Sequence, residues 1–66
     1  MVMVPRAPLE RIMRQAGAES ETEGAVEQLR ESVEELGEEL ADAAVEEADA
    51  ADRTTVTLAD IEEAAR

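Results

Sequence analysis

Apolar side chains recur along the middle of the chain at the spacing of an α-helix. Between residues 22 and 51, successive apolar positions are three or four residues apart, which keeps them on one face of a helix. The spacing predicts one long helix of about 28 residues, roughly 42 Å from end to end, with Thr22 as its N-cap. The other faces carry mainly Glu, Asp and Ala. The apolar stripe comprises Val26, Leu29, Val33, Leu36, Leu40, Ala44, Ala48 and Ala51.

A shorter apolar pattern precedes the long helix. Positions i, i+3, i+4 and i+7 are apolar between residues 9 and 16, which predicts a helix over residues 8–16. Pro8 fits the first turn, where its missing N–H costs nothing, and Gly17 stands where helices commonly end. A helix of under three turns does not persist alone, so we expect it to lie across the long one. The four apolar residues are Leu9, Ile12, Met13 and Ala16.

The last part of the chain predicts a loop and a third helix. Residues 54–57 are all β-branched, which favours an extended backbone. Thr57, with Asp60 three residues later, is an acidic variant of the capping box, and it predicts a helix from Leu58 to the chain end at Arg66. The fold class is therefore all-α, with a short, a long and a short helix. Residues 1–7 are expected to form an N-terminal arm and residues 8–66 one domain.

The long helix has too much apolar surface for its own short flanks to cover. Chains of this length rarely gain more than about 3–5 kcal/mol from a single core, and the 66 residues include no Cys for a disulfide. We therefore expect a second copy to cover the stripe. Gly37 would allow another backbone to approach closely, although it is also explained as a tolerated helical Gly. The expected dimer core is Leu29, Val33, Leu36, Gly37 and Leu40.

Charge is distributed unevenly along the chain. The net charge is −12, yet residues 1–18 carry three Arg against one Glu, and residues 19–52 carry 14 acids against one Arg. Taken alone, such an acidic field repels nucleic acid. All six bases are Arg, and a Lys-free acidic surface suits a cytoplasm with molar salt. The alternative of a disordered acidic chain conflicts with the regular apolar stripe.

Several function classes lack their signatures. The sequence has no His or Cys and no Gly-rich phosphate loop, so we expect no enzyme and no cofactor. The acidic stretch EELGEEL has no ligand spacing of a structural metal site. No apolar run is long enough to span a membrane, and the start does not have the order of a signal peptide. A soluble cytoplasmic protein without a small-molecule substrate is the expectation.

Several short strings are spread through the chain from about Val4 to Arg66. They are Ala7-Pro8-Leu9, Arg11-Ile12-Met13-Arg14, Ala16-Gly17-Ala18-Glu19, Glu34-Glu35-Leu36-Gly37, Arg53-Thr54-Thr55-Val56 and Asp60-Ile61-Glu62. Together, in this order and at this spacing, they resemble the archaeal histone family without a gap. The combination is specific, although no single string decides alone.

The resemblance implies a histone fold, in which two chains pack head to tail with their long helices crossing. It also implies sequence-nonspecific binding of duplex DNA along one edge of the dimer, and therefore a place in the nucleoid. The partner is a second copy or another histone-fold chain, and the sequence is either a stand-alone protomer or one half of a tandem. The alternative function is an acidic interaction module that pairs with histone-fold or basic proteins and leaves DNA alone.

The resemblance also implies roles for single residues. Arg11 matches an arginine that enters the DNA minor groove, where negative potential is concentrated, and Arg14 a phosphate contact. Their alternatives are a solvated side chain for Arg11 and an ion pair with Glu10 for Arg14. Arg53 matches a loop residue near phosphate that also forms a salt bridge with Asp60.

Thr55 completes the implied DNA-binding set, because its N–H and hydroxyl can contact phosphate without reading sequence; a plain strand Thr is its alternative. Two further positions depart from the family. Ser20 and Thr54 stand where the family commonly has Arg and Lys, so two phosphate contacts are lost. Glu47 and Ala50 also depart from the family at the dimer–dimer contact, which puts stacking of dimers in doubt.

Overall fold

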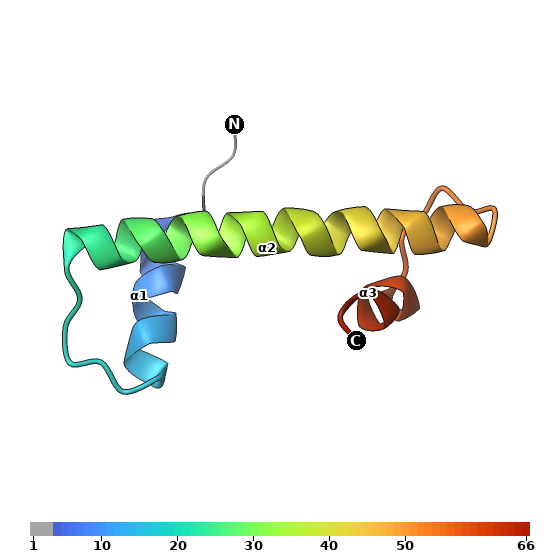
Figure 1. The fold of residues 1–66 in the computed structure, drawn as a ribbon. Coiled ribbons are helices and arrows are strands. Elements are labelled where there is room, and N and C mark those ends of the chain that lie inside the picture. Colours follow the sequence, from blue (N-terminus) through green and yellow to red (C-terminus); the bar gives the residue numbers. More distant parts are fainter. Residues whose placement is uncertain (1–3) are drawn as a thin grey trace. The chain divides into compact units, whose positions relative to one another are not determined.

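The computed structural model describes residues 4–66, and within this range it contains three helices and no strand. Helix α1 spans Arg6–Gln15, α2 spans Glu23–Ala50 and α3 spans Leu58–Ala64 (Figure 1). The short, long, short order predicted from the apolar spacing is confirmed. The contacts within the chain divide it after Glu35 into two compact units.

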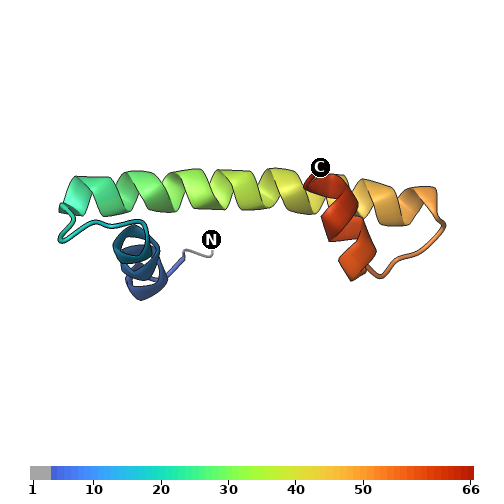
Figure 2. The same ribbon diagram turned by 90° about the horizontal axis from the view of Figure 1, so that it is seen from below.

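In the first unit, α1 packs against the N-terminal half of α2 (Figures 1 and 2). Leu9 of α1 and Val26 of α2 are fully buried there, whereas Ile12 remains largely exposed. Helix α1 begins at Arg6, two residues before the predicted start. Pro8 is then the third residue of the helix and still lies in the first turn, where no N–H is needed. Of the predicted arm, residues 1–3 lie outside the described residues.

Two helix ends share one hydrogen-bond pattern. After α1, the Ala18 and Gly17 N–H groups donate to the Met13 and Arg14 carbonyls, and Gly17 has φ 111°. This is a Schellman motif, in which the left-handed position is usually Gly. After α2, the Arg53 and Asp52 N–H groups repeat the pattern, but Asp52 takes the left-handed position with φ 58°. An L residue with a Cβ is strained in that conformation.

Replacing Asp52 with Gly is expected to stabilise the protein by about 0.5–1 kcal/mol per chain. Glycine removes the cost of the left-handed backbone, and it also removes a negative charge from the negative end of the α2 dipole. Chemical unfolding at fixed protein concentration measures the change. Asp52→Ala is the control, because it removes the charge but keeps the backbone strain. Equal stabilities of the two variants would mean that only the charge matters.

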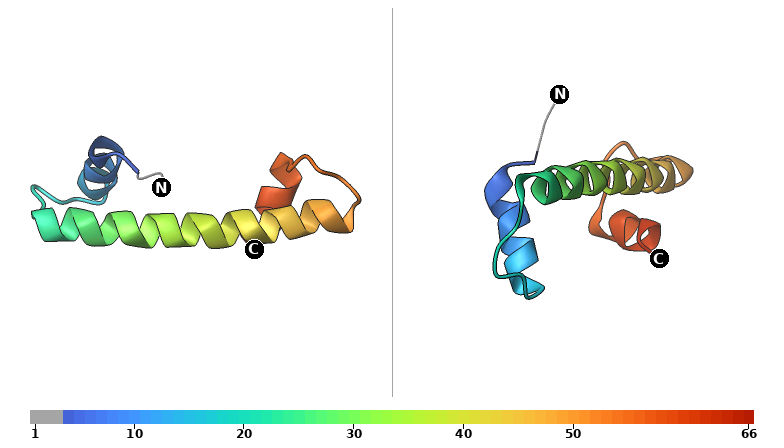
Figure 3. Two further views of the ribbon diagram at one scale, coloured as in Figure 1. Left: turned by 90° about the horizontal axis from the view of Figure 1, so that it is seen from above. Right: turned by 60° about the vertical axis from the view of Figure 1, so that its left-hand side comes forward.

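In the second unit, α3 lies against the C-terminal part of α2 (Figure 3). Ala44 and Ala48 of α2 are buried there, but Leu58 and Ile61 of the predicted α3 face remain exposed. Helix α3 ends at Ala64, two residues before the predicted end. The preceding segment is extended at Thr57, with φ −107° and ψ 170°, whereas Thr54 and Thr55 lie in bends. The predicted extended segment is therefore realised in part.

The middle of the apolar stripe is not covered by the rest of the described chain. Leu36 is 61% exposed, and Leu29, Val33 and Leu40 are only half-buried. No atom lies within 4 Å of the position that a Cβ on Gly37 would take. Among residues 4–66, the buried apolar side chains are Leu9, Val26, Ala44 and Ala48.

Candidate nucleic-acid interface

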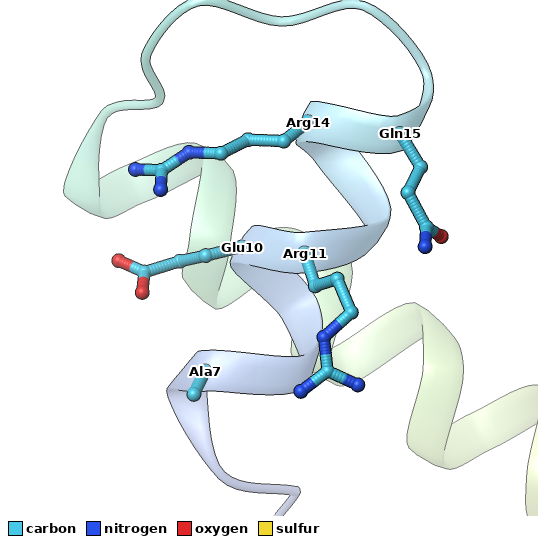
Figure 4. Close-up of a pocket in the computed structure, with 5 residues that line it drawn as sticks. All are labelled: Ala7, Glu10, Arg11, Arg14 and Gln15. Carbon is cyan, nitrogen blue, oxygen red and sulfur yellow. The ribbon is translucent and has the colours of Figure 1, made fainter.

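The outer face of α1 carries two of the predicted DNA-binding arginines. Arg11 and Arg14 line a shallow surface hollow together with Ala7, Glu10 and Gln15 (Figure 4). The two arginines are three residues apart and therefore start from neighbouring positions on the helix. Their guanidinium groups nevertheless point in different directions, as Figure 4 shows.

Arg11 extends into solvent, and within residues 4–66 it forms no ion pair and no side-chain hydrogen bond. An exposed guanidinium without a carboxylate partner retains its full charge and all five donors for an external acceptor. The geometry therefore allows Arg11 to contact a phosphate or to enter a narrow groove without first breaking an internal contact.

The alternative partner predicted for Arg14 is wrong. Its Nη2 lies 3.4 Å from Glu21 Oε1, in the linker before α2, and not against Glu10. Glu10 instead accepts a hydrogen bond from Arg6 Nε at 2.8 Å, one helical turn earlier. The sequence spacing allowed both the Arg6 and the Arg14 pairing, and the position of the linker relative to α1 decides between them.

Arg6 and Val4 join α1 to α2, and the sequence prediction did not include either. The Arg6 guanidinium also pairs with Glu23 at the start of α2, and hydrogen bonds to Glu10 and Glu23 raise its pKa. Val4 N–H donates to Glu34 Oε2 at 2.8 Å, and Arg30 Nε donates to the Val4 carbonyl at 2.9 Å. Arg30 and Glu34 stand one helical turn apart, so their side chains can bind the carbonyl and the N–H of one residue. Nothing in the sequence identifies Val4 as that residue.

The loop between α2 and α3 is organised around a buried carboxylate. Asp60 is 4% exposed and accepts two hydrogen bonds from the Arg53 guanidinium, at 2.8 and 2.9 Å. Its Oδ2 also accepts the Thr57 N–H at 2.8 Å and the Thr57 hydroxyl at 3.1 Å. The Arg53 and Thr57 hydrogen bonds hold the pKa of Asp60 far below its usual value, and Asp60 raises that of Arg53.

This cluster also fixes the loop backbone near Thr55. Arg53 Nη1 donates to the Thr55 carbonyl at 2.9 Å, and the Thr55 side chain is exposed. The loop therefore presents an exposed hydroxyl beside a guanidinium that is already committed to internal acceptors. Arg53 thus supports the loop, and its charge is largely matched by Asp60.

Other kinds of site are not found in the part of the chain that the structure describes. Over residues 4–66 there is no group of three or more acidic, His or Cys side chains placed to hold a metal ion. No helix in this range is both long and apolar enough to cross a membrane.

Comparison with known proteins gives a family match over nearly the whole chain. Residues 2–65 match the family described as histone-like transcription factor (CBF/NF-Y) and archaeal histone. No curated protein matches the sequence significantly. The matched range includes α1, α2, the Arg53–Asp60 loop and the whole of α3.

Proposed function

Because the chain belongs to the family of histone-like transcription factors (CBF/NF-Y) and archaeal histones, we propose that it is an architectural chromatin protein. In this proposal a dimer with the histone fold binds duplex DNA weakly and without reading its sequence. The observation that carries the proposal is the family match over residues 2–65, together with the three-helix order. In this proposal the protein is associated with the chromosome. Its acidic surface suits a cytoplasm with high salt.

The dimer is supported by the uncovered apolar stripe. Leu36 is exposed, while Leu29, Val33 and Leu40 are covered only in part. A second histone-fold chain, identical or related, covers these side chains when the two long helices cross. The open space beside Gly37 allows close approach at that crossing.

The DNA-binding residues in this proposal are Arg11, Arg14, Arg53 and Thr55. Contacts of guanidinium, hydroxyl and backbone N–H groups with phosphate position a protein on duplex DNA but carry no sequence information. This assignment is supported by the exposure of Arg11 and Thr55 to solvent. Since Arg14 and Arg53 already have carboxylate partners, each dimer edge neutralises few phosphates.

A mobility shift of duplex DNA across a salt series tests the proposal. We expect a shift at about 50 mM salt and a shallow slope of log affinity against log salt, which corresponds to about 2–4 neutralised phosphates per dimer edge. Arg11→Gln should weaken binding and lower that slope by about 1 for each Arg11 in contact. A folded dimer that fails to shift DNA at this low salt would exclude the function.

A second candidate is an acidic histone-fold module that binds other proteins and not DNA. It is favoured by the 14 acids against one Arg in residues 19–52. A pull-down at working salt distinguishes the two functions. Basic or histone-fold proteins recovered without any DNA crosslink would favour the interaction module.

A further inference from the structure

Glu21 is an unusually enclosed acid for a residue in a linker. Its side chain is only 4% exposed, although it lies between α1 and α2. One carboxylate oxygen, Oε1, accepts from Arg14 at 3.4 Å. The other oxygen, Oε2, is buried and has no hydrogen-bond partner in the described part of the chain. Arg14 is 63% exposed and is the only cation that Glu21 contacts there.

The Arg14–Glu21 contact occupies the group that would bind DNA. Carboxylates and phosphates are the same class of partner for a guanidinium, which donates to either through charge-assisted hydrogen bonds. Arg14 therefore has to leave Glu21 before it engages a phosphate fully. Its departure leaves a buried carboxylate without a counter-charge, and an unpaired buried charge is unfavourable. The exchange is thus opposed by the enclosure of Glu21.

We propose that Glu21 is an internal competitor for DNA phosphate, which holds Arg14 out of the interface and lowers the affinity for DNA. The inference rests on the proposed function and assigns a regulating residue to the same surface. Arg11, which has no internal partner among residues 4–66, supplies the binding on α1 that remains. Glu21 therefore determines how many α1 arginines act on the duplex.

Two glutamates in the linker provide a matched comparison. Glu21→Gln and Glu19→Gln change the net charge equally, but Glu19 is exposed and has no ion pair in the described residues. In a mobility shift across salt, Glu21→Gln should increase affinity about tenfold at 0.1 M salt, and the salt slope should steepen by about 2 per dimer as both Arg14 side chains engage. Glu19→Gln should leave the slope unchanged. The gain from Glu21→Gln should disappear when Arg14→Gln is added.

A second measurement does not depend on the folding of the Glu21 variant. In the otherwise unchanged protein, Arg14→Gln should weaken DNA binding several-fold less than Arg11→Gln does, because Glu21 already occupies Arg14. Equal losses from Arg14→Gln and Arg11→Gln would overturn the inference and leave the proposed function standing. Equal gains in DNA affinity from Glu21→Gln and Glu19→Gln would also overturn the inference and leave the proposed function standing. Absence of any shift, for every folded variant at about 50 mM salt, would overturn both.

Discussion

Replacing Leu36 with Gln is expected to dissociate the proposed dimer and unfold most of the protein at micromolar concentration. Leu36 is 61% exposed in the single chain, so within one chain its loss should change stability by less than about 0.5 kcal/mol. Covered by a second copy, each Leu36 is worth about 2 kcal/mol, and a dimer loses two of them. The combined loss of about 4 kcal/mol weakens dimerisation roughly a thousandfold.

Sedimentation and circular dichroism over a range of protein concentrations, at one fixed high salt, measure this effect. Glu35→Gln is the matched control, because it introduces the same side chain at the neighbouring exposed position, which lies about 100° around α2 from Leu36 and outside the apolar stripe. Its dimer should remain intact. A Leu36→Gln variant that stays as dimeric and as helical as the control would show that the stripe is not the interface. That result would exclude both the proposed dimer and the DNA-binding edge that is proposed for it.

The parts of this fold that the sequence predicts are those decided by neighbours in the chain. The spacing of the apolar stripe indicates α2, and local capping chemistry marks helix starts. Thr22 Oγ1 accepts from the Ala25 N–H at 3.2 Å, and Thr57 and Asp60 complete the reciprocal capping box. Gly17 likewise takes the left-handed position that ends α1. The two caps span four residues and the Gly17 motif spans six, from Met13 to Ala18, so the residue types alone determine each of them.

The contacts that the sequence did not predict depend on how one element lies against another. The partner of Arg14 is set by the path of the linker, which brings Glu21 and not Glu10 to its guanidinium. The two hydrogen bonds that hold Val4 against α2 join residues 26 and 30 positions apart in the sequence. Glu10 stands at helical spacing from both Arg6 and Arg14, so the sequence leaves the ion pairs of α1 undecided. The net +2 of residues 1–18 therefore overstates the charge available to DNA.

Replacing Asp60 with Asn is expected to lower the melting temperature by several degrees, more than any single exposed acid does. The carboxylate accepts four hydrogen bonds from Arg53 and Thr57, and a neutral amide cannot balance the Arg53 charge or accept through both atoms. Arg53→Lys should reproduce much of the loss, because an ammonium cannot make the two parallel bonds of a guanidinium. Glu62→Gln, an exposed change on the same helix, is the control and should have little effect.

The pH dependence distinguishes a lost charge pair from a general packing defect. The folded-state pKa of Asp60 is depressed, whereas an unfolded Asp has a pKa of about 3.9. A depressed pKa contributes stability that is complete above the unfolded value and is lost as the pH falls towards the folded one. The gap in unfolding free energy between the native protein and Asp60→Asn should therefore be constant above about pH 5 and shrink below about pH 4. Unfolding curves of both proteins at matched high salt measure the gap, and a gap that stays constant down to pH 3 would show that the Asp60 charge does not stabilise the loop.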